Sequence, residues 1–112
     1  MKITKELQEQ IKELNLIEQQ VQNLSLQRQT FQMELNETES ALDEVKNSNN
    51  GIYKIIGQVM IKTTKEEISK ELKEKKEILA LRIKSIENQE KFLREKLEKT
   101  KKSIEEKLEK KK

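Results

Sequence analysis

The chain has 112 residues, of which 40% are charged and only 32% are apolar, and its net charge is +3. So little apolar material excludes a thick globular core, and a stable fold must bury a narrow stripe or borrow apolar surface from another chain. Cysteine and histidine are absent, which excludes disulfides and the usual zinc sites, and we expect no cofactor or metal.

The first predicted element is a long helix over residues 4–46. Apolar residues recur in it every seven positions, with a second set three positions further on, as is typical of a helix that pairs along a narrow seam. The two sets are Leu7, Leu14, Val21, Leu35 and Leu42, then Ile17, Leu24, Phe31 and Val45. Total disorder is the alternative for this composition, but disorder gives no reason for fixed spacing. The run 47–50, followed by Gly51, predicts that the helix ends in a left-handed cap.

Residues 52–61 predict a β-hairpin. Gly57-Gln58 suits a two-residue type II′ turn with glycine in the first central position. The pairs that such a turn sets opposite each other are Ile56 with Val59, Ile55 with Met60, and Lys54 with Ile61. The predicted assembly residues are Ile52, Tyr53, Ile55, Ile56, Gly57, Val59, Met60 and Ile61.

This hairpin is expected to need a partner because both of its faces are largely apolar. A lone two-stranded hairpin is marginal in water, and burying six aliphatic side chains is worth on the order of 10 kcal/mol. We therefore expect hairpins of several chains to join into a shared sheet or barrel. The alternative is a hairpin folded onto its own helices.

The last predicted element is a second long helix over residues 64–108. Its seam residues are Leu72, Leu79, Ile86 and Leu93, with Ile83, Leu97 and Ile104. Thr63 with Glu66, or Thr64 with Glu67, forms a capping box at its start. Because the connection is short, the helices must run antiparallel. The predicted fold is mainly α: one unit over residues 1–112, an antiparallel two-helix coiled coil with a β-hairpin at its bend.

Six polar residues interrupt the two seams. They are Gln10, Arg28 and Thr38 in the first helix, and Lys76, Glu90 and Thr100 in the second. We expect their stems to lie on the seam and their polar heads to reach water.

The end of the second helix is basic. Residues 91–112 contain ten Lys or Arg against five Asp or Glu, and they finish in Lys110, Lys111 and Lys112. One interpretation is a solvated helix with pairs such as Glu95 and Lys99 four residues apart. The other is docking to an acidic partner.

The sequence disfavours an enzyme, a nucleic-acid-binding protein and a membrane protein. Its carboxylates are interleaved with lysines, and no nucleophile–base pair or glycine-rich phosphate loop is present. Aromatic residues make up only 3% of the chain, which disfavours nucleic-acid binding by base stacking. The N-terminal residues lack an apolar signal region, and no apolar run is long enough to span a bilayer. The cytoplasm is the expected location, without membrane contact.

From about residue 15 to residue 110 the chain resembles prefoldin β-type subunits. The matching segments are 27–29 and 34–37 in the first helix, 53–57 leading to Ile61 in the insert, and 71–75, 82–83 and 87–90 in the second helix. A single hairpin points to the β type, because α-type subunits have two. The absence of cysteine is more similar to archaeal members than to eukaryotic ones.

The resemblance implies a hexamer of two α-type and four β-type subunits, built on a double β-barrel of hairpins. It also implies ATP-independent binding of non-native proteins and their delivery to a group II chaperonin. Clients would bind at the coiled-coil tips, which here carry Ile3, Leu7, Ile11, Ile104 and Leu108. The basic residues 110–112 would help to dock the chaperonin. The rival interpretation is a structural coiled-coil tether or dimerisation module that binds no clients and does not need residues 52–61.

Overall fold

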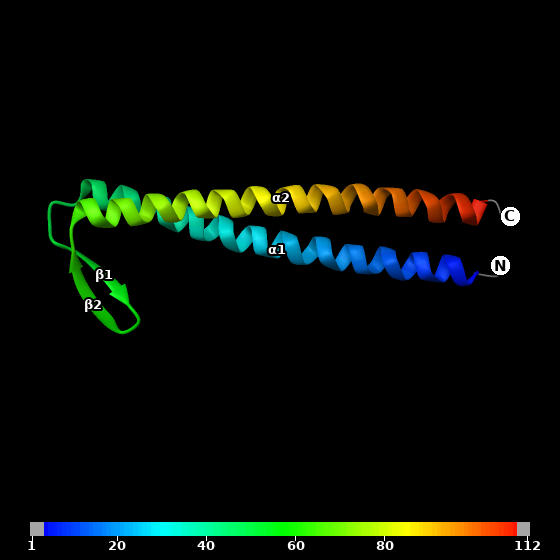
Figure 1. The fold of residues 1–112 in the computed structure, drawn as a ribbon, viewed down its shortest axis with the longest axis horizontal. Helices are drawn as coiled ribbons and strands as arrows, with labels where there is room; N and C mark the ends of the chain where they lie inside the picture. The colour runs from blue at the N-terminus through cyan, green and yellow to red at the C-terminus, as the bar shows by residue number, and fades with distance from the viewer. Residues whose placement is uncertain (1–3, 110–112) are drawn as a thin grey trace. The chain divides into compact units, whose positions relative to one another are not determined.

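The structure is a computed structural model that describes residues 4–109 (Figure 1). In chain order its elements are helix α1 (Lys5–Asn47), strand β1 (Ile52–Ile56), strand β2 (Val59–Thr63) and helix α2 (Lys65–Glu109). The mainly α fold class, with two long helices and one two-stranded antiparallel hairpin, is therefore confirmed.

The chain divides into two compact units. The terminal unit consists of residues 1–28 and 85–112, and the hairpin unit consists of residues 29–84. Each unit contains a part of α1 and a part of α2, and the two helical parts run antiparallel within it (Figure 1).

The terminal unit buries some of the heptad residues of each helix. Its buried apolar residues are Leu7, Ile17, Val21, Ile86 and Ile104. Polar contacts follow the same antiparallel order. Near the start of α1, Gln10 contacts Ser103, whereas further along α1, Arg28 contacts Glu90. The seven-residue spacing thus predicted the face of each helix that is buried.

The hairpin unit has a thinner core in its helical part. Leu79 and Ile83 of α2 are buried, while Phe31 of α1 is half-buried. The guanidinium carbon of Arg82 lies 5.7 Å from the centroid of the Phe31 ring, within the range of a cation–π contact. This seam relies on a few apolar residues, and the guanidinium group of Arg82 lies over one of them, Phe31.

Two polar seam residues do not send their heads to water, so that expectation is wrong for them. Thr38 is buried and its hydroxyl donates to the carbonyl of Glu34 at 2.8 Å. Glu90 is buried, and its Oε1 accepts from Nε of Arg28 at 2.6 Å. Because burying an unpaired charge is costly, the carboxylate of Glu90 is held by an ion pair instead of by water.

Threonines cap both helices at their N-termini. Thr4 Oγ1 accepts from the backbone N–H of Leu7 at 3.2 Å, and Thr64 Oγ1 accepts from that of Glu67 at 3.1 Å. Of the two capping options at the second helix, the structure selects Thr64. The Glu67 carboxylate accepts instead from the hydroxyl of Thr63 at 3.3 Å.

The end of α1 differs from the prediction of a left-handed cap. Among the described residues no non-glycine residue has a positive φ, and the glycine that does is Gly57. Near the end of α1, the carbonyl of Lys46 accepts from Lys65 Nζ at 2.8 Å and that of Val45 accepts from the backbone N–H of Ser48 at 3.4 Å. Lys65 Nζ also donates at 3.4 Å to the carbonyl of Ser48, the first residue after the helix. A lysine at this place also complements the negative end of the helix dipole.

The hairpin register follows its turn. Ile56 pairs with Val59, Ile55 with Met60 and Lys54 with Ile61, as predicted, and the ladder continues to Ile52 with Thr63. Gly57 has φ of 59°, and Gln58 lacks a positive φ. This combination is that of a type II′ turn, in which only the first central residue needs the left-handed region.

Candidate functional site

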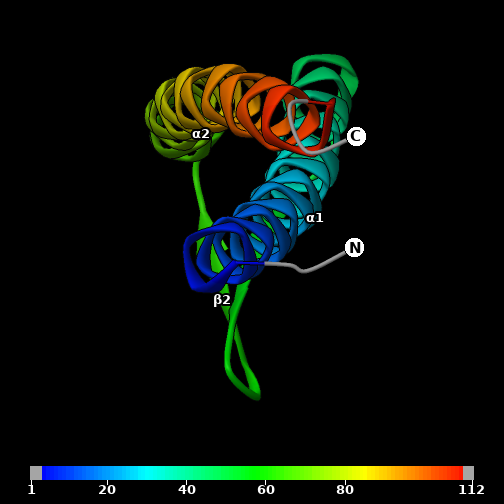
Figure 2. The ribbon, with the colours of Figure 1, turned by 90° about the vertical axis from the view of Figure 1, so that its right-hand side faces the viewer.

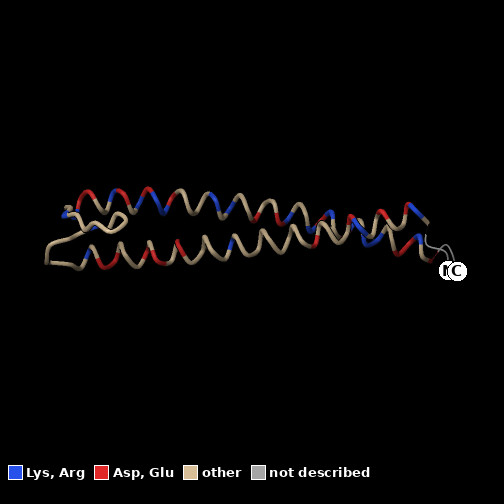
Figure 3. Tube along the Cα trace, turned by 90° about the horizontal axis from the view of Figure 1, so that it is seen from below, with Lys and Arg blue, Asp and Glu red and all other residues tan. Residues whose placement is uncertain are grey.

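The hairpin presents apolar side chains to solvent on both faces. Ile55 is 70% exposed and Met60 65% exposed on one face, while Ile56 and Val59 are 55% and 58% exposed on the other. Tyr53 and Ile61 are exposed as well. In Figure 3 the hairpin contains few charged residues (blue and red), whereas charged residues recur along both helices. Exposed apolar area concentrated in this way marks an interaction surface.

The hairpin is half-buried at its open end and contacts α2 through Lys54, the middle residue of β1. Ile52 and Thr63, which pair at the open end, are half-buried, and Lys54 Nζ lies 3.1 Å from Oε1 of Glu71 on α2. From this end the strands project to the side of the helical part of their unit (Figures 1 and 2). The alternative, in which the hairpin folds down onto its own helices, therefore does not fit the exposed hairpin residues.

The predicted client-binding residues that the structure describes lie in the terminal unit. Leu7 is 1% exposed and Ile104 8% exposed, whereas Ile11 and Leu108 are half-buried. Ile3 lies outside the described residues. The structure thus places the described predicted residues near one end of each helix, but it places the largest part of their apolar surface inside the helix pair.

Polar residues that the sequence analysis did not single out as functional surround this place. Lys107 Nζ lies 2.6 Å from Oε1 of Glu6 and 3.0 Å from Oε1 of Gln10. Gln10 Nε2 in turn donates to Oγ of Ser103 at 3.1 Å. Glu6, Gln10, Ser103 and Lys107 form what we call the end cluster. The contacts join positions 93 to 101 residues apart, so only knowledge of the helix register would have revealed them.

The predicted chaperonin-docking residues 110–112 lie outside the described part of the chain. Within the described part, Lys99, Lys101 and Lys102 are exposed near the end of α2. The basic character noted in the sequence is therefore present on the surface of this helix.

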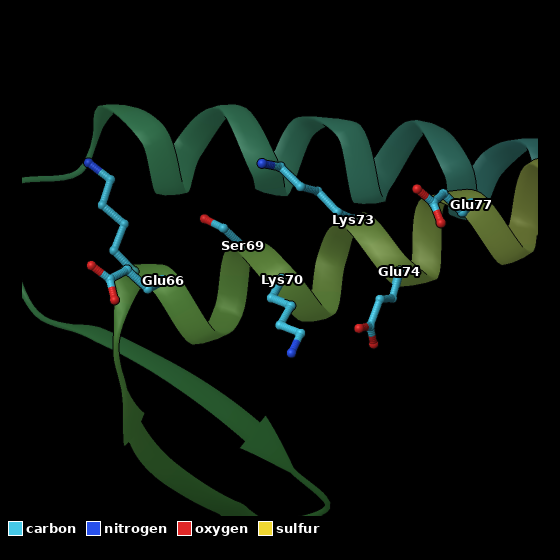
Figure 4. Close-up of a pocket in the computed structure, with 7 residues that line it drawn as sticks. Glu66, Ser69, Lys70, Lys73, Glu74 and Glu77 are labelled. Carbon is cyan, nitrogen blue, oxygen red and sulfur yellow. The ribbon is translucent and has the colours of Figure 1, made fainter.

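The residues that line a surface hollow on α2 are not arranged as a catalytic site. Its lining residues are Lys65, Glu66, Ser69, Lys70, Lys73, Glu74 and Glu77. Figure 4 shows these side chains leaving one helix in different directions, without converging on a common point. Over residues 4–109, no group of three or more carboxylates is placed to hold a metal ion. Neither described helix has a stretch apolar enough to cross a membrane.

Comparisons with known proteins agree with this geometry. The model of the family described as "Prefoldin subunit" matches residues 8–111. A prefoldin subunit beta of Thermococcus kodakarensis is 40% identical over 97 residues, covering 85% of this chain and 83% of that protein. One of Saccharolobus islandicus is 36% identical over 98 residues, covering 86% and 78%.

A solved structure extends the similarity to the fold. The crystal structure of the prefoldin beta subunit from Thermococcus strain KS-1 superposes with a TM-score of 0.88 at 38% identity, covering 96% of both chains. The two helices and the hairpin of the present chain are thus shared with an experimentally determined subunit.

Proposed function

Because the chain belongs to the prefoldin family as a β-type subunit, we propose that it works in an ATP-independent chaperone assembly that holds non-native proteins. Prefoldin subunits are chaperones and not enzymes. The observation that carries the proposal is the exposed apolar hairpin, because residues 4–109 leave this surface uncovered.

Assembly is the first part of the proposal. Hairpins from several subunits join edge to edge and face to face, which removes both the wet apolar side chains and the unpaired strand edges. The partners are α-type prefoldin subunits and further copies of this chain, in a hexamer of two α-type and four β-type subunits with a β-barrel hub. The exposure of Ile55, Ile56, Val59 and Met60 supports this arrangement.

Client binding is the second part. The ends of the helix pairs, with Ile3, Leu7, Ile11, Ile104 and Leu108, offer apolar contacts to unfolded proteins. Terminal turns open more easily than the middle of a helix. Weak contacts from several arms of one assembly then add up through multivalency, so each arm can release its segment of the client readily.

Delivery is the third part. The assembly acts in the cytoplasm and passes its client to a group II chaperonin. Residues 110–112, together with the exposed lysines near the end of α2, steer the encounter with an acidic surface of that chaperonin.

The test is an aggregation assay without nucleotide, performed on the chain alone and on the chain mixed with an α-type subunit. Sedimentation of the same samples reads the mass of the assembly. We expect suppression of the aggregation of guanidine-denatured citrate synthase by the mixed assembly. If neither sample protects any unfolded protein although the chains assemble, the tether interpretation replaces the chaperone one.

A further inference from the structure

The described client-binding residues of the terminal unit are partly or fully closed off. Leu7 has 1% of its surface exposed and Ile104 has 8%, while Ile11 and Leu108 are half-buried. A side chain that is buried against its own partner helix cannot at the same time pack against a foreign protein. Binding at these residues therefore requires the two helix ends to separate first.

The end cluster lies on both sides of this closed place. On α1, Leu7 stands between Glu6 and Gln10, and on α2, Ile104 stands between Ser103 and Lys107. Three contacts cross from helix to helix: Glu6 to Lys107 at 2.6 Å, Gln10 to Lys107 at 3.0 Å and Gln10 to Ser103 at 3.1 Å. Lys107 takes part in two of the three, so it is the centre of the cluster.

The geometry points to a latch: the end cluster holds Leu7 and Ile104 inside the helix pair, and a client reaches them only when the cluster opens. This inference rests on the proposed function, in which clients bind at these ends. The polar contacts are partly exposed, with side chains 75% exposed at Glu6 and 32% at Lys107. Exposed pairs of this kind contribute little each, which suits a latch that opens often without help from ATP.

The first experiment measures opening without any client. Lys107→Met keeps most of the side-chain length but removes both Lys107 contacts. The matched control is Lys96→Met, which removes the same charge from the Glu13–Lys96 pair, also in the terminal unit and 3.6 Å long. In the assembled protein, we expect hydrogen exchange of peptides around residues 8–13 and 103–107 to be about two- to five-fold faster in Lys107→Met. Exchange there at the wild-type rate, or equal acceleration by Lys96→Met, would overturn the latch.

The second experiment closes the latch covalently. The chain has no native cysteine, so the double variant Gln10→Cys/Ser103→Cys places one thiol on each helix where the wild-type side chains are in contact. A bismaleimide cross-linker with a reducible spacer joins the two thiols, because cysteine does not reach as far as the glutamine that it replaces. We expect the cross-linked form to lose its protection of guanidine-denatured citrate synthase and the same protein, with the spacer cleaved by reduction, to regain it. Undiminished protection by the cross-linked form would overturn the gating.

The rate of client capture completes the test. We expect Lys107→Met to capture citrate synthase about two- to five-fold faster, in step with its hydrogen exchange. Faster exchange with unchanged capture would also contradict the latch. Failure of the proposed function is distinct, because then the wild-type assembly protects no client while the exchange experiment still reports whether the cluster holds the ends together.

Discussion

At the scale of single residues, Glu90 is a buried carboxylate that ion pairs hold in place. Its side chain is 7% exposed and contacts Nε of Arg28 at 2.6 Å and Nη2 of Arg94 at 3.6 Å. Glu90→Gln keeps the shape but removes the charge that holds both guanidinium groups. We expect this substitution to lower the free energy of unfolding by about 1–3 kcal/mol, measured by urea denaturation at fixed protein concentration.

A control separates burial from charge in this experiment. Glu13→Gln removes a carboxylate from an exposed pair in the same unit, and we expect it to change stability by less than about 0.5 kcal/mol. The double variant Arg28→Leu/Glu90→Leu should be about as stable as wild type or more stable, because a buried ion pair seldom outperforms apolar packing. Equal losses in Glu90→Gln and Glu13→Gln would mean that burial of Glu90 has no energetic role.

Residue-level detail was the part of the molecule least accessible from the sequence. The heptads placed Glu90 on the seam correctly, but its partner Arg28 is 62 residues away, and only the alignment of the two helices brings them together. The end cluster could not be predicted for the same reason, because only the alignment of the two helices brings its residues together. Leu7 and Ile104 were assigned to the helix ends as client contacts, and the structure adds that both are buried there.

At the scale of elements, the beginning of α2 offers a direct comparison between adjacent threonines. Thr64 Oγ1 accepts from the backbone N–H of Glu67 at 3.1 Å, while the hydroxyl of Thr63 donates to the Glu67 carboxylate at 3.3 Å. We expect Thr64→Ala to cost about 1 kcal/mol of stability and to speed hydrogen exchange at the Glu67 amide. Thr63→Ala should leave that amide almost unchanged. A larger effect from Thr63→Ala would show that the capping residue is the earlier threonine.

The elements themselves were largely predictable because their signals are local. Gly57-Gln58 sets the turn type, and the turn sets the register of every pair up to Ile52 and Thr63. The cap of α1 was predicted wrongly for the opposite reason. The carbonyl of Lys46 accepts from Lys65, which is 19 positions further along the chain, and no local sequence pattern indicates that the chain returns to this place.

At the scale of the whole molecule, the fold leaves one apolar element uncovered while the helices cover each other. The same chain thus has apolar side chains in two different settings: those of the hairpin are exposed, and Leu7 and Ile104 near the helix ends are buried. Composition could predict that this chain must either bury a narrow stripe or borrow apolar surface from another chain, because only 32% of its residues are apolar. It could not predict which residues the helices would themselves bury.

The hairpin proposal can be tested at this scale by replacing one cross-strand pair. Ile55 and Met60 lie opposite each other and are 70% and 65% exposed. Ile55→Lys/Met60→Glu makes that face polar, while the opposite charges across the strands keep the hairpin itself stable. Because like surfaces could then no longer bury each other, we expect the mass from sedimentation to fall to that of a single chain or a loose pair. Leu81→Glu is the control: Leu81 is 69% exposed but lies on α2, so its loss should leave assembly intact. An undiminished assembly mass in the hairpin variant would rule out the hairpin as the surface that joins the subunits.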